Sequence, residues 1–378
     1  MADALGIEHL TDLTNGEAVA AFFTPLIIFA VFFVLQIILP ARKVTGYVTD
    51  RDTGEPRNYR LNGLLVFAIA HLVWAFGLFG LPRDWFYRSS LWAVVGGTVF
   101  CAIFAVWSVF TQPKGEITNP WLALWEGRSQ ELQLFGGRID IKMWWYVVGG
   151  TMLSLNALSG AVWHHNRFGD DANPGIYLYA AFWTFYTFDY FIWERVQLYT
   201  YDLIHEHIGF KLWWGGLVAY GWLFILPLWG MAAHPDPGYS TGLTYFWLIA
   251  VCVLFLGGWT IGRGANLQKY TFKRWPDRKF LWVEPEYIEA GERKILCSGW
   301  WRPARHFNYL GEGILAVSFA LVFGHPGNLW AWTYSIFVIS FFTVRQRFDE
   351  RACEQKYGPE KWAEYQAKVK YRIFPGIY

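Results

Sequence analysis

Polar side chains gather in the segment 298–312 (SGWWRPARHFNYLGE), directly ahead of a short apolar run. His306, Asn308 and Glu312 stand where the chain would enter a bilayer, and polar groups there cost free energy unless they meet a partner or a ligand. An aromatic anchor at the membrane surface would explain the tryptophans and arginines of this segment, but not these three residues. The segment is therefore a candidate ligand site.

A second group of polar residues follows the last apolar run. Arg345, Asp349, Cys353 and Tyr357 are spaced four apart, so they share one face of a helix, and Gly358 with the next proline should end that helix. A solvated helix with ion pairs would show the same spacing. Beyond it, Trp362, Tyr365 and Val369 fall on one side, which suggests a segment that lies along the membrane or covers a pocket.

The connection 263–309 holds ten basic residues and five acidic ones. Anionic lipid heads or the topology rule alone would account for the charge. Tryptophan and tyrosine residues are interleaved with these cations, however, and a cation beside flat rings suits a nucleotide cofactor that carries phosphates. No glycine-rich phosphate loop of the Rossmann or Walker type occurs, so such a cofactor would not be held by a Rossmann domain. We read 263–309 as a cytoplasmic loop.

Acidic residues also lie inside or beside the apolar run 174–192. Asp189 and Tyr190 are followed by Glu194, Asp202 and Glu206. An ionisable group inside a span is a functional candidate by default, although a structural hydrogen bond between helices would also explain it. His205 and His207 are two apart and would diverge on a helix, and His164–His165 is no better placed, so we predict no metal.

The elements that position these residues are apolar helices. Of the 378 residues, 54% are hydrophobic, 20% aromatic and only 16% charged, which excludes disorder and a nucleic-acid tail and indicates a membrane protein. The first eighteen residues lack the basic start of a cleaved signal peptide, so the first run is expected to stay as an anchor. Nine runs could span a bilayer: 18–40, 61–81, 89–112, 143–163, 174–192, 212–233, 239–262, 310–323 and 329–344, with the last two joined by a turn at 325–328.

The basic residues predict the orientation. Of 32 lysines and arginines, 29 lie in the alternate connections 41–60, 113–142, 193–211, 263–309 and 345–378. By the positive-inside rule these face the cytoplasm, as does the carboxyl terminus. Nine spans place the amino terminus outside, and a hidden tenth helix in 113–142 or 193–211 would reverse it. Residues 1–165 are mainly spans, whereas 174–378 hold the intramembrane acids and the large cytoplasmic segments 263–309 and 345–378, so we expect the chemistry in the second half.

Four blocks of the chain resemble the sterol reductase family, which includes Δ14-, Δ7- and Δ24(28)-sterol reductases and the membrane domain of the lamin B receptor. They are YRLNGLL at 59–65, GRGANLQKYTFK at 262–273, SGWW with ARHFNYLGE at 298–312, and the last thirty residues from Asp349. The last block is highly specific for this family. The RH–NY–G portion of 298–312 is less specific, because isoprenylcysteine methyltransferases and steroid 5α-reductases carry a similar motif. The sequence departs from the family pattern at Arg302–Pro303, at Glu312 where Asp is common, and at Lys273 where Arg is usual.

The resemblance implies an all-α, polytopic membrane protein with ten helices, one more than the hydropathy gives. It also implies NADPH as cofactor, held in a pocket that faces the cytoplasm. Carried over by position, the cofactor-binding residues are Lys269, Lys273, Leu296, Trp301, Asn308, Tyr309, Asp349, Cys353, Glu354, Gln355, Lys356, Tyr357 and Tyr365.

The chemistry that the resemblance implies is reduction of a sterol double bond, for which we favour C14=C15 over the Δ7 and Δ24(28) bonds. Protonation of the alkene gives a carbocation that a hydride then quenches, so an acid is needed inside an apolar pocket. Our candidates for it are Tyr190, Asp189, Asp349 and Tyr365, with Glu312 behind them. The sterol is expected to enter from the lipid.

Two other classes of protein remain open: a membrane methyltransferase that uses S-adenosylmethionine, and a lipid-sensing protein without activity. The methyl donor is a sulfonium cation, so the basic connection 263–309 favours NADPH over it. We expect no nucleic-acid partner, since the net charge is only +2. The short amino terminus and the lack of a retention signal favour a bacterial inner membrane over the endoplasmic reticulum.

Overall fold

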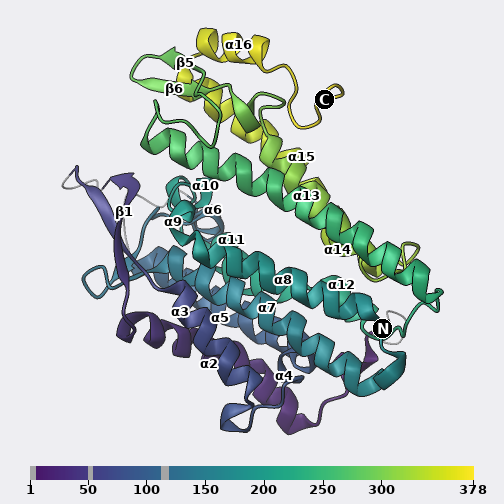
Figure 1. Cartoon of the computed structure of the whole chain (residues 1–378). Coiled ribbons are helices and arrows are strands. Elements are labelled where there is room, and N and C mark those ends of the chain that lie inside the picture. Colours follow the sequence, from purple (N-terminus) through teal and green to yellow (C-terminus); the bar gives the residue numbers. More distant parts are fainter. Residues whose placement is uncertain (1–5, 50–53, 112–118) are drawn as a thin grey trace. The chain divides into compact units, whose positions relative to one another are not determined.

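The computed structural model describes residues 6–49, 54–111 and 119–378, and these fold into two compact units, Met1–Pro237 and Gly238–Tyr378. Each unit is a helical bundle with small antiparallel sheets of two strands each (Figure 1). The prediction of a mainly helical protein is therefore confirmed. The β-hairpins were not predicted, because hydropathy does not detect them.

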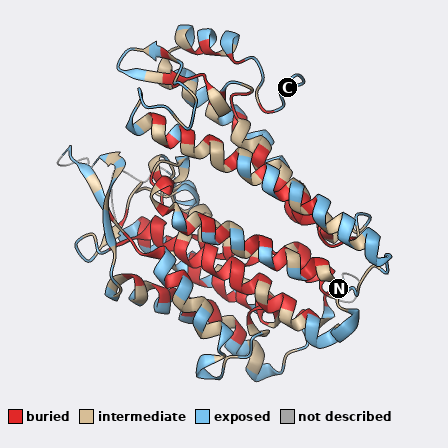
Figure 2. Ribbon diagram, viewed as in Figure 1, coloured by how far each residue is buried: buried red, intermediate tan, exposed pale blue. Residues whose placement is uncertain are grey.

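The first unit is built around one long buried helix, α7, which packs against α8 and the π-helical turn η4. Its middle turns are buried on all sides, as Figure 2 shows. Tryptophans fill the surrounding core, among them Trp144, Trp145, Trp213 and Trp222. The elements of this unit are η1 (Glu8–Leu10), α2 (Asn15–Ile38), β1 (Arg42–Thr49), β2 (Pro56–Leu61), α3 (Gly63–Ala75), η2 (Leu78–Gly80), α4 (Trp85–Arg88), α5 (Ser90–Thr111), α6 (Pro120–Glu126), β3 (Gln133–Leu134), β4 (Ile139–Asp140), α7 (Ile141–Phe168), η3 (Gly169–Asp171), α8 (Pro174–Ile192), α9 (Glu194–Gln197), α10 (Tyr201–Ile204), α11 (Phe210–Trp214), η4 (Gly215–Leu223) and α12 (Leu226–Met231).

The second unit consists of three longer helices, a hairpin and a terminal helix. Its elements are α13 (Thr241–Arg274), β5 (Tyr287–Ala290), β6 (Arg293–Leu296), η5 (Gly299–Trp301), α14 (Phe307–Leu321), α15 (Leu329–Tyr357) and α16 (Pro359–Lys368). α13 and α14 approach closely because glycines face each other. A Cβ on Gly311 would lie 2.5 Å from the backbone nitrogen of Gly262 and 2.8 Å from the carbonyl oxygen of Gly258. Small residues at such a crossing are typical of helices packed in a membrane.

Within the described residues, four helical stretches are long and apolar enough to cross a membrane: Asn15–Ile38, Ser90–Thr111, Phe210–Met231 and Thr241–Arg274. The pair Gly63–Ala75 and Leu78–Arg88 would make a fifth, but it is bent by 78°. The bend lies at Gly77, whose positive φ of 59° follows the end of α3, so the helix within the predicted run 61–81 ends at Ala75. The remaining runs also fall on helices, and the count of nine or ten spans stays a prediction.

The predicted loop 263–309 is corrected in its first part. α13 does not end with the apolar run but continues as a helix to Arg274. Lys269 and Lys273 therefore lie on a rigid helix. In contrast, the predicted helix through 345–357 is confirmed, because α15 runs without a break to Tyr357 and Gly358, at φ 86°, ends it.

Candidate functional site

The segment around η5 is fixed against the polar end of α13. The side chain of Gln268 donates a hydrogen bond to the Ser298 carbonyl (3.2 Å) and accepts one from the Trp300 backbone (2.8 Å). A Cβ on Gly264 would lie 2.6 Å from the Trp300 ring, so this close packing needs the glycine. The Trp301 indole donates to the Ala265 carbonyl (2.9 Å), and the ammonium of Lys269 lies 4.5 Å from the centre of that indole ring. A cation and a flat ring are thus held side by side.

Tyr309 and Asp349 form a hydrogen-bonded pair between α14 and α15. The Tyr309 hydroxyl donates to Oδ2 of Asp349, whose other oxygen lies 3.5 Å from Nε of Arg345. The Tyr309 ring is sandwiched between two others, with His306 at 5.2 Å and Phe342 at 4.3 Å between ring centroids. These stacks fix the phenol, so the proton that it donates to the carboxylate is held at one defined place.

Three lysines lie close enough to Cys353 to interact with it electrostatically: Lys269 and Lys273 on α13, and Lys356 on α15. Lys273 is close enough to Lys269, Lys356 and Cys353 to interact with all three electrostatically. Burial lowers the pKa of Lys356, and Lys269 and Arg293 lower it further, although Cys353 opposes this. Burial likewise raises the pKa of the Cys353 thiol. Like charges held together in this way repel one another, so an anion among them would be stabilised.

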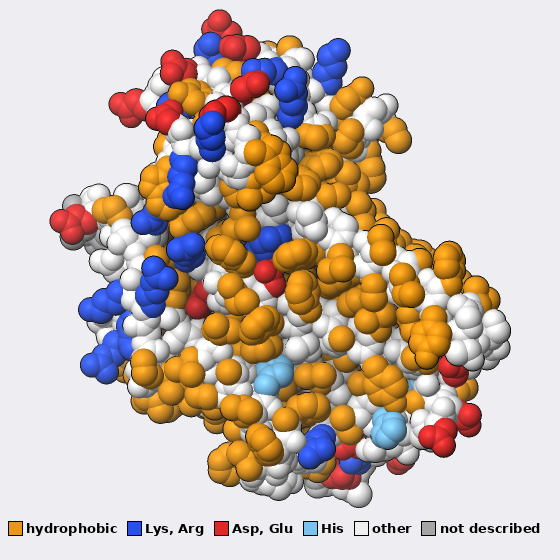
Figure 3. Space-filling view, in the orientation of Figure 1, with side chains coloured by type: hydrophobic (Ala, Val, Ile, Leu, Met, Phe, Trp, Pro, Cys, Tyr) orange, Lys and Arg blue, Asp and Glu red, His pale blue; other side chains and the backbone are white. Residues whose placement is uncertain are grey.

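α16 packs against the hairpin β5–β6, and Cys353 lies against the hydrophobic cluster that they form. Trp362, Tyr365 and Val369 share one buried side, as predicted, and they pack against the hairpin residues Ile288 and Ile295 and against Cys297. Burial raises the pKa of Tyr365 well above its usual range, so its hydroxyl keeps its proton at neutral pH. Leu296 belongs to a neighbouring cluster with Trp301. Charged side chains of this unit gather over the end that carries the hairpin and α16 (Figure 3).

A profile of the Ergosterol biosynthesis ERG4/ERG24 family matches residues 7–378. The chain belongs to this family. It is 32% identical over 363 residues to a Delta(14)-sterol reductase of Methylotuvimicrobium alcaliphilum, covering 91% of this chain and 80% of that one. It is 29% identical to a Delta(14)-sterol reductase of Arabidopsis thaliana (90% and 91% covered) and 29% identical to the mouse Delta(14)-sterol reductase TM7SF2 (93% and 85% covered). The predicted resemblance is confirmed, and the chain is a sterol reductase homologue of the oxidoreductase class.

Not all residues that the family resemblance implies come together. Lys269, Lys273, Trp301, Cys353 and Lys356 lie near one another, and Tyr309 meets Asp349. Glu354 and Gln355 are exposed on α15. Asn308 and Tyr357 are half-buried, and the Tyr357 ring stacks on Trp362.

The remaining candidates of this reductase homologue, Asp189 and Tyr190, lie on α8 in the first unit. Asp189 is buried, and the ring of Tyr190 is tilted by 30° against that of Tyr186, with ring centroids 5.4 Å apart. Tyr190 also interacts electrostatically with Tyr146 of α7, which donates a hydrogen bond to Oδ2 of Asp202 (3.1 Å). Sequence reasoning did not identify Tyr146 as a candidate residue, because no local pattern distinguishes it from the other aromatic residues of its apolar run.

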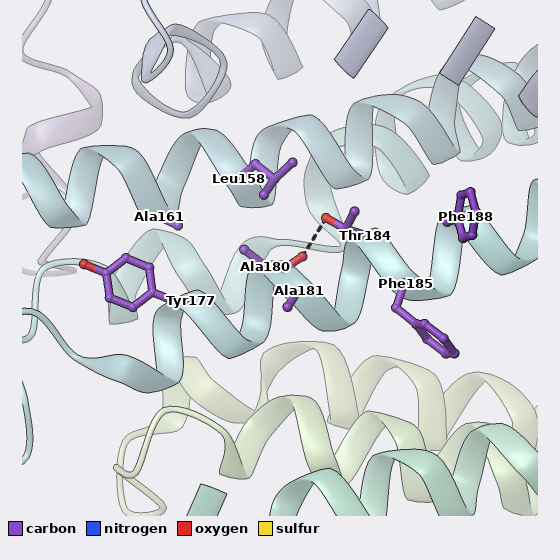
Figure 4. A pocket seen from close by; sticks show the side chains of 8 residues that line it. All are labelled: Leu158, Ala161, Tyr177, Ala180, Ala181, Thr184, Phe185 and Phe188. Carbon is purple, nitrogen blue, oxygen red and sulfur yellow. Dashed lines mark hydrogen bonds between the residues drawn. The ribbon is translucent and has the colours of Figure 1, made fainter. Parts of the chain in front are cut away.

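The first unit also carries an apolar groove of about 490 Å³ between α7 and α8. Its lining, drawn in Figure 4, consists of Leu158, Ala161, Tyr177, Ala180, Ala181, Thr184, Phe185 and Phe188. The hydroxyl of Thr184 donates to the Ala180 carbonyl (2.8 Å). Neither Asp189 nor Tyr190 lines this groove. Among the residues that the structure describes, no three His, Cys, Asp or Glu side chains are placed to hold a metal ion.

Proposed function

We propose that this protein reduces the C14=C15 double bond of a sterol with NADPH. The names of its relatives support the reaction. The proposed cofactor rests on one observation: Lys269, Lys273 and Lys356 lie near the half-buried thiol of Cys353, and Lys269 lies beside the indole of Trp301. Cations concentrated next to a flat ring fit a nucleotide with several phosphate charges, and they disfavour a sulfonium cation such as S-adenosylmethionine.

The lysines bind phosphate oxygens, and Trp301 with Leu296 offers apolar surface to a ring. NADPH, when bound, supplies a hydride to the sterol. The protein must deliver the matching proton to the other carbon of the double bond, so that one proton and one hydride together add two hydrogens. Asp349 and Tyr309 hold a proton between them at a fixed place, and Tyr365 keeps its own because burial raises its pKa.

Protonation leaves a tertiary carbocation on the sterol. An anion close to that cation lowers the barrier, most of all where water is excluded. The Asp349 carboxylate, which accepts the hydrogen bond of the Tyr309 hydroxyl, supplies such an anion. Asp189 and Tyr190 remain donor candidates from the first unit, since Asp189 is buried in α8 and Tyr190 is coupled to Tyr146.

We further propose that the lysine group faces the cytoplasm, that the sterol enters from the bilayer, and that the membrane is a bacterial inner membrane. The distribution of the basic residues supports the first point. The apolar helices support a place in a membrane.

The direct test is to incubate the purified full chain with NADPH and, in separate reactions, Δ14, Δ7 and Δ24(28) sterols. We expect the Δ14 sterol alone to gain two mass units. Deuterium at C4 of the cofactor should label one carbon, and D2O the other. If no sterol gains mass while a prenylcysteine is methylated, the reductase function is wrong; if the Δ7 sterol reacts instead, the bond is wrong.

A further inference from the structure

Glu350, the residue after Asp349, is the centre of a buried charge cluster. Its carboxylate is buried on α15, and Nε of Arg305 donates to Oε1 at 2.5 Å. Nε2 of His306 lies 3.6 Å from the same oxygen. The other oxygen accepts a hydrogen bond from Gln366 (3.4 Å) and lies 3.4 Å from Nε of Arg372. One carboxylate therefore holds three segments: the approach to α14, α16 and the carboxyl-terminal segment.

The backbone reinforces this cluster. The amides of Arg305 and His306 donate to the carbonyls of Tyr371 (2.9 Å) and Arg372 (2.7 Å). The Arg305 guanidinium also donates to the carbonyls of Val369 (2.7 Å) and Lys370 (2.8 Å). The segment 305–306 is thus held against 369–372 by main-chain bonds, and Glu350 supplies the charge that keeps Arg305 between them.

The cluster leads directly to the phenol of the site. His306, in contact with Glu350, stacks on Tyr309 with only 9° between the ring planes. Tyr309 in turn donates to Asp349, the neighbour of Glu350 on α15. Successive helical residues point about 100° apart, so the two acids meet different groups. Asp349 meets the Tyr309 hydroxyl, and Glu350 meets His306, the ring stacked on Tyr309.

We propose that Glu350 is a positioning residue of the reductase site, which places the Tyr309–Asp349 pair through His306 and the carboxyl-terminal segment. This inference rests on the proposed function, because it assumes that the Tyr309–Asp349 pair takes part in the reaction. Glu350 itself has no place in the resemblance to the family's cofactor residues. Its role follows from its contacts alone.

A permanent charge suits this role. Burial alone would raise the pKa of Glu350, but the neighbouring His306 and Arg305 outweigh it and lower the pKa to about 2. A carboxyl whose pKa is lowered on folding stabilises the fold above its ordinary pKa and loses that contribution only as the pH falls through about 2. Glu350 therefore stays ionised wherever the enzyme works, and Arg305, His306 and Arg372 always meet an anion.

The test is Glu350→Gln in the full chain, with Glu360→Gln as the matched control, because Glu360 is an exposed acid at the start of α16. Small displacements of reacting groups cost up to about 100-fold in rate, so we expect kcat to fall roughly 10- to 100-fold in the Glu350 variant. The dissociation constant of NADPH should change less than kcat, since the lysine group is untouched. The control should keep both values.

A double-mutant cycle with Tyr309→Phe separates positioning from general damage. If Glu350 acts through Tyr309, its substitution should cost much less in the Tyr309→Phe background than in the wild type. Equal losses in both backgrounds, or a Glu350→Gln enzyme with the kcat of the control, would overturn the inference. Should Glu350→Gln fail to fold, Arg372→Gln removes one outer partner of the same carboxylate, and the same non-additivity is expected on a smaller scale.

Hydrogen exchange supplies a readout that needs no turnover. Glu350→Gln should speed amide exchange in peptides covering 303–309 and 369–378, while the peptides of α13 keep their protection. Unchanged exchange in both peptides overturns the inference even if the enzyme reduces sterols. Faster exchange together with an inactive wild type would show that the proposed function has failed and that the structural link has not.

Discussion

Lys269 offers the sharpest test of the proposed cofactor site, because a phosphate that it binds would be present in NADPH and absent from NADH. Its ammonium lies over the Trp301 ring at 4.5 Å, and it interacts electrostatically with Lys273 and Lys356. In Lys269→Ala the cation–π contact with Trp301 is lost from the free and the bound protein alike, so it lowers stability by about 0.5–1 kcal/mol and changes cofactor affinity little. A lost hydrogen bond to a charged phosphate costs about 1.5–3 kcal/mol of binding free energy, but only when the ligand carries that phosphate.

These magnitudes translate into a clear difference between two cofactors. At about 1.4 kcal/mol per tenfold change in affinity, the phosphate contact corresponds to a loss of roughly 10- to 150-fold for NADPH. NADH lacks the extra phosphate, so its affinity should fall much less. Titration of tryptophan fluorescence with each cofactor measures both dissociation constants on the same protein.

The matched control is Lys279→Ala. Lys279 lies in the same connection but is exposed and paired with Glu284, so its removal should change neither dissociation constant by more than about twofold, as for most surface charges. Equal losses of NADPH and NADH in Lys269→Ala would refute the assignment of Lys269 to the phosphate. An equal effect of Lys279→Ala would show that the whole basic face attracts the cofactor and that no single lysine binds its phosphate.

The pH dependence of the same titration has a definite sign. Burial and the neighbouring Lys269 and Arg293 lower the pKa of Lys356, so it loses its proton at a lower pH than a free lysine. A phosphate binds the protonated form, and NADPH affinity should therefore fall as the pH rises through that lowered pKa. In Lys269→Ala one cause of the lowering is gone, so the fall should begin at higher pH. A fall that begins at the same pH in both proteins would contradict this coupling.

Three other substitutions test the site and the fold. Tyr365→Phe should lower kcat at least about tenfold with little change in KM if its hydroxyl is the proton donor, as general acids typically contribute 10²–10⁴-fold; wild-type turnover would remove Tyr365 from the donors. Gly311→Ala should destabilise the protein by about 1–3 kcal/mol, since its Cβ would press on the backbone of α13, whereas Gly257→Ala, with open space around it, should leave the melting temperature unchanged. Lys142→Met should destabilise the first unit by about 2–5 kcal/mol, because the buried ammonium donates to the carbonyls of Asp202, Leu203 and Glu206 at 2.6–3.2 Å.

Sequence reasoning located the helices where apolar composition alone decides them. α2, α5 and α13 coincide with long uncharged runs, and Gly358 ends α15 where the glycine–proline pair predicted. Hydropathy could not show that α13 continues past its apolar part, because the last turns of the helix, GRGANLQKYTFK at 262–273, contain many polar residues. The hairpin of β1 and β2 was missed for a similar reason, because its strands carry polar residues on both faces and no short turn motif joins them.

The site was predictable in its parts but not in its pairings. The spacing of Arg345 and Asp349 indicated a shared helical face, and they do lie within ion-pair distance. The bond between Tyr309 and Asp349 joins residues 40 apart, and no local pattern encodes it. No pattern in the sequence distinguishes Glu350 from the other acids near the end of the chain. Only the packing of Arg305, His306 and Arg372 around it reveals a buried anion, and such long-range contacts depend on tertiary structure.

Under the proposed function, a water-soluble cofactor and an apolar substrate share one site, and the lengths of α13 and α15 suit this arrangement. At 1.5 Å per residue, 34 residues make α13 about 51 Å long and 29 residues make α15 about 44 Å long. Both exceed the ~30 Å of a hydrocarbon core, so each helix extends well beyond it. The projecting turns hold Lys269 and Lys273 on one helix and Asp349, Cys353 and Lys356 on the other. Because a helix is rigid over such a length, the polar groups keep a fixed distance from the apolar turns that face lipid. A proton donor and a phosphate-binding group can therefore be placed relative to a sterol without a separate nucleotide-binding domain.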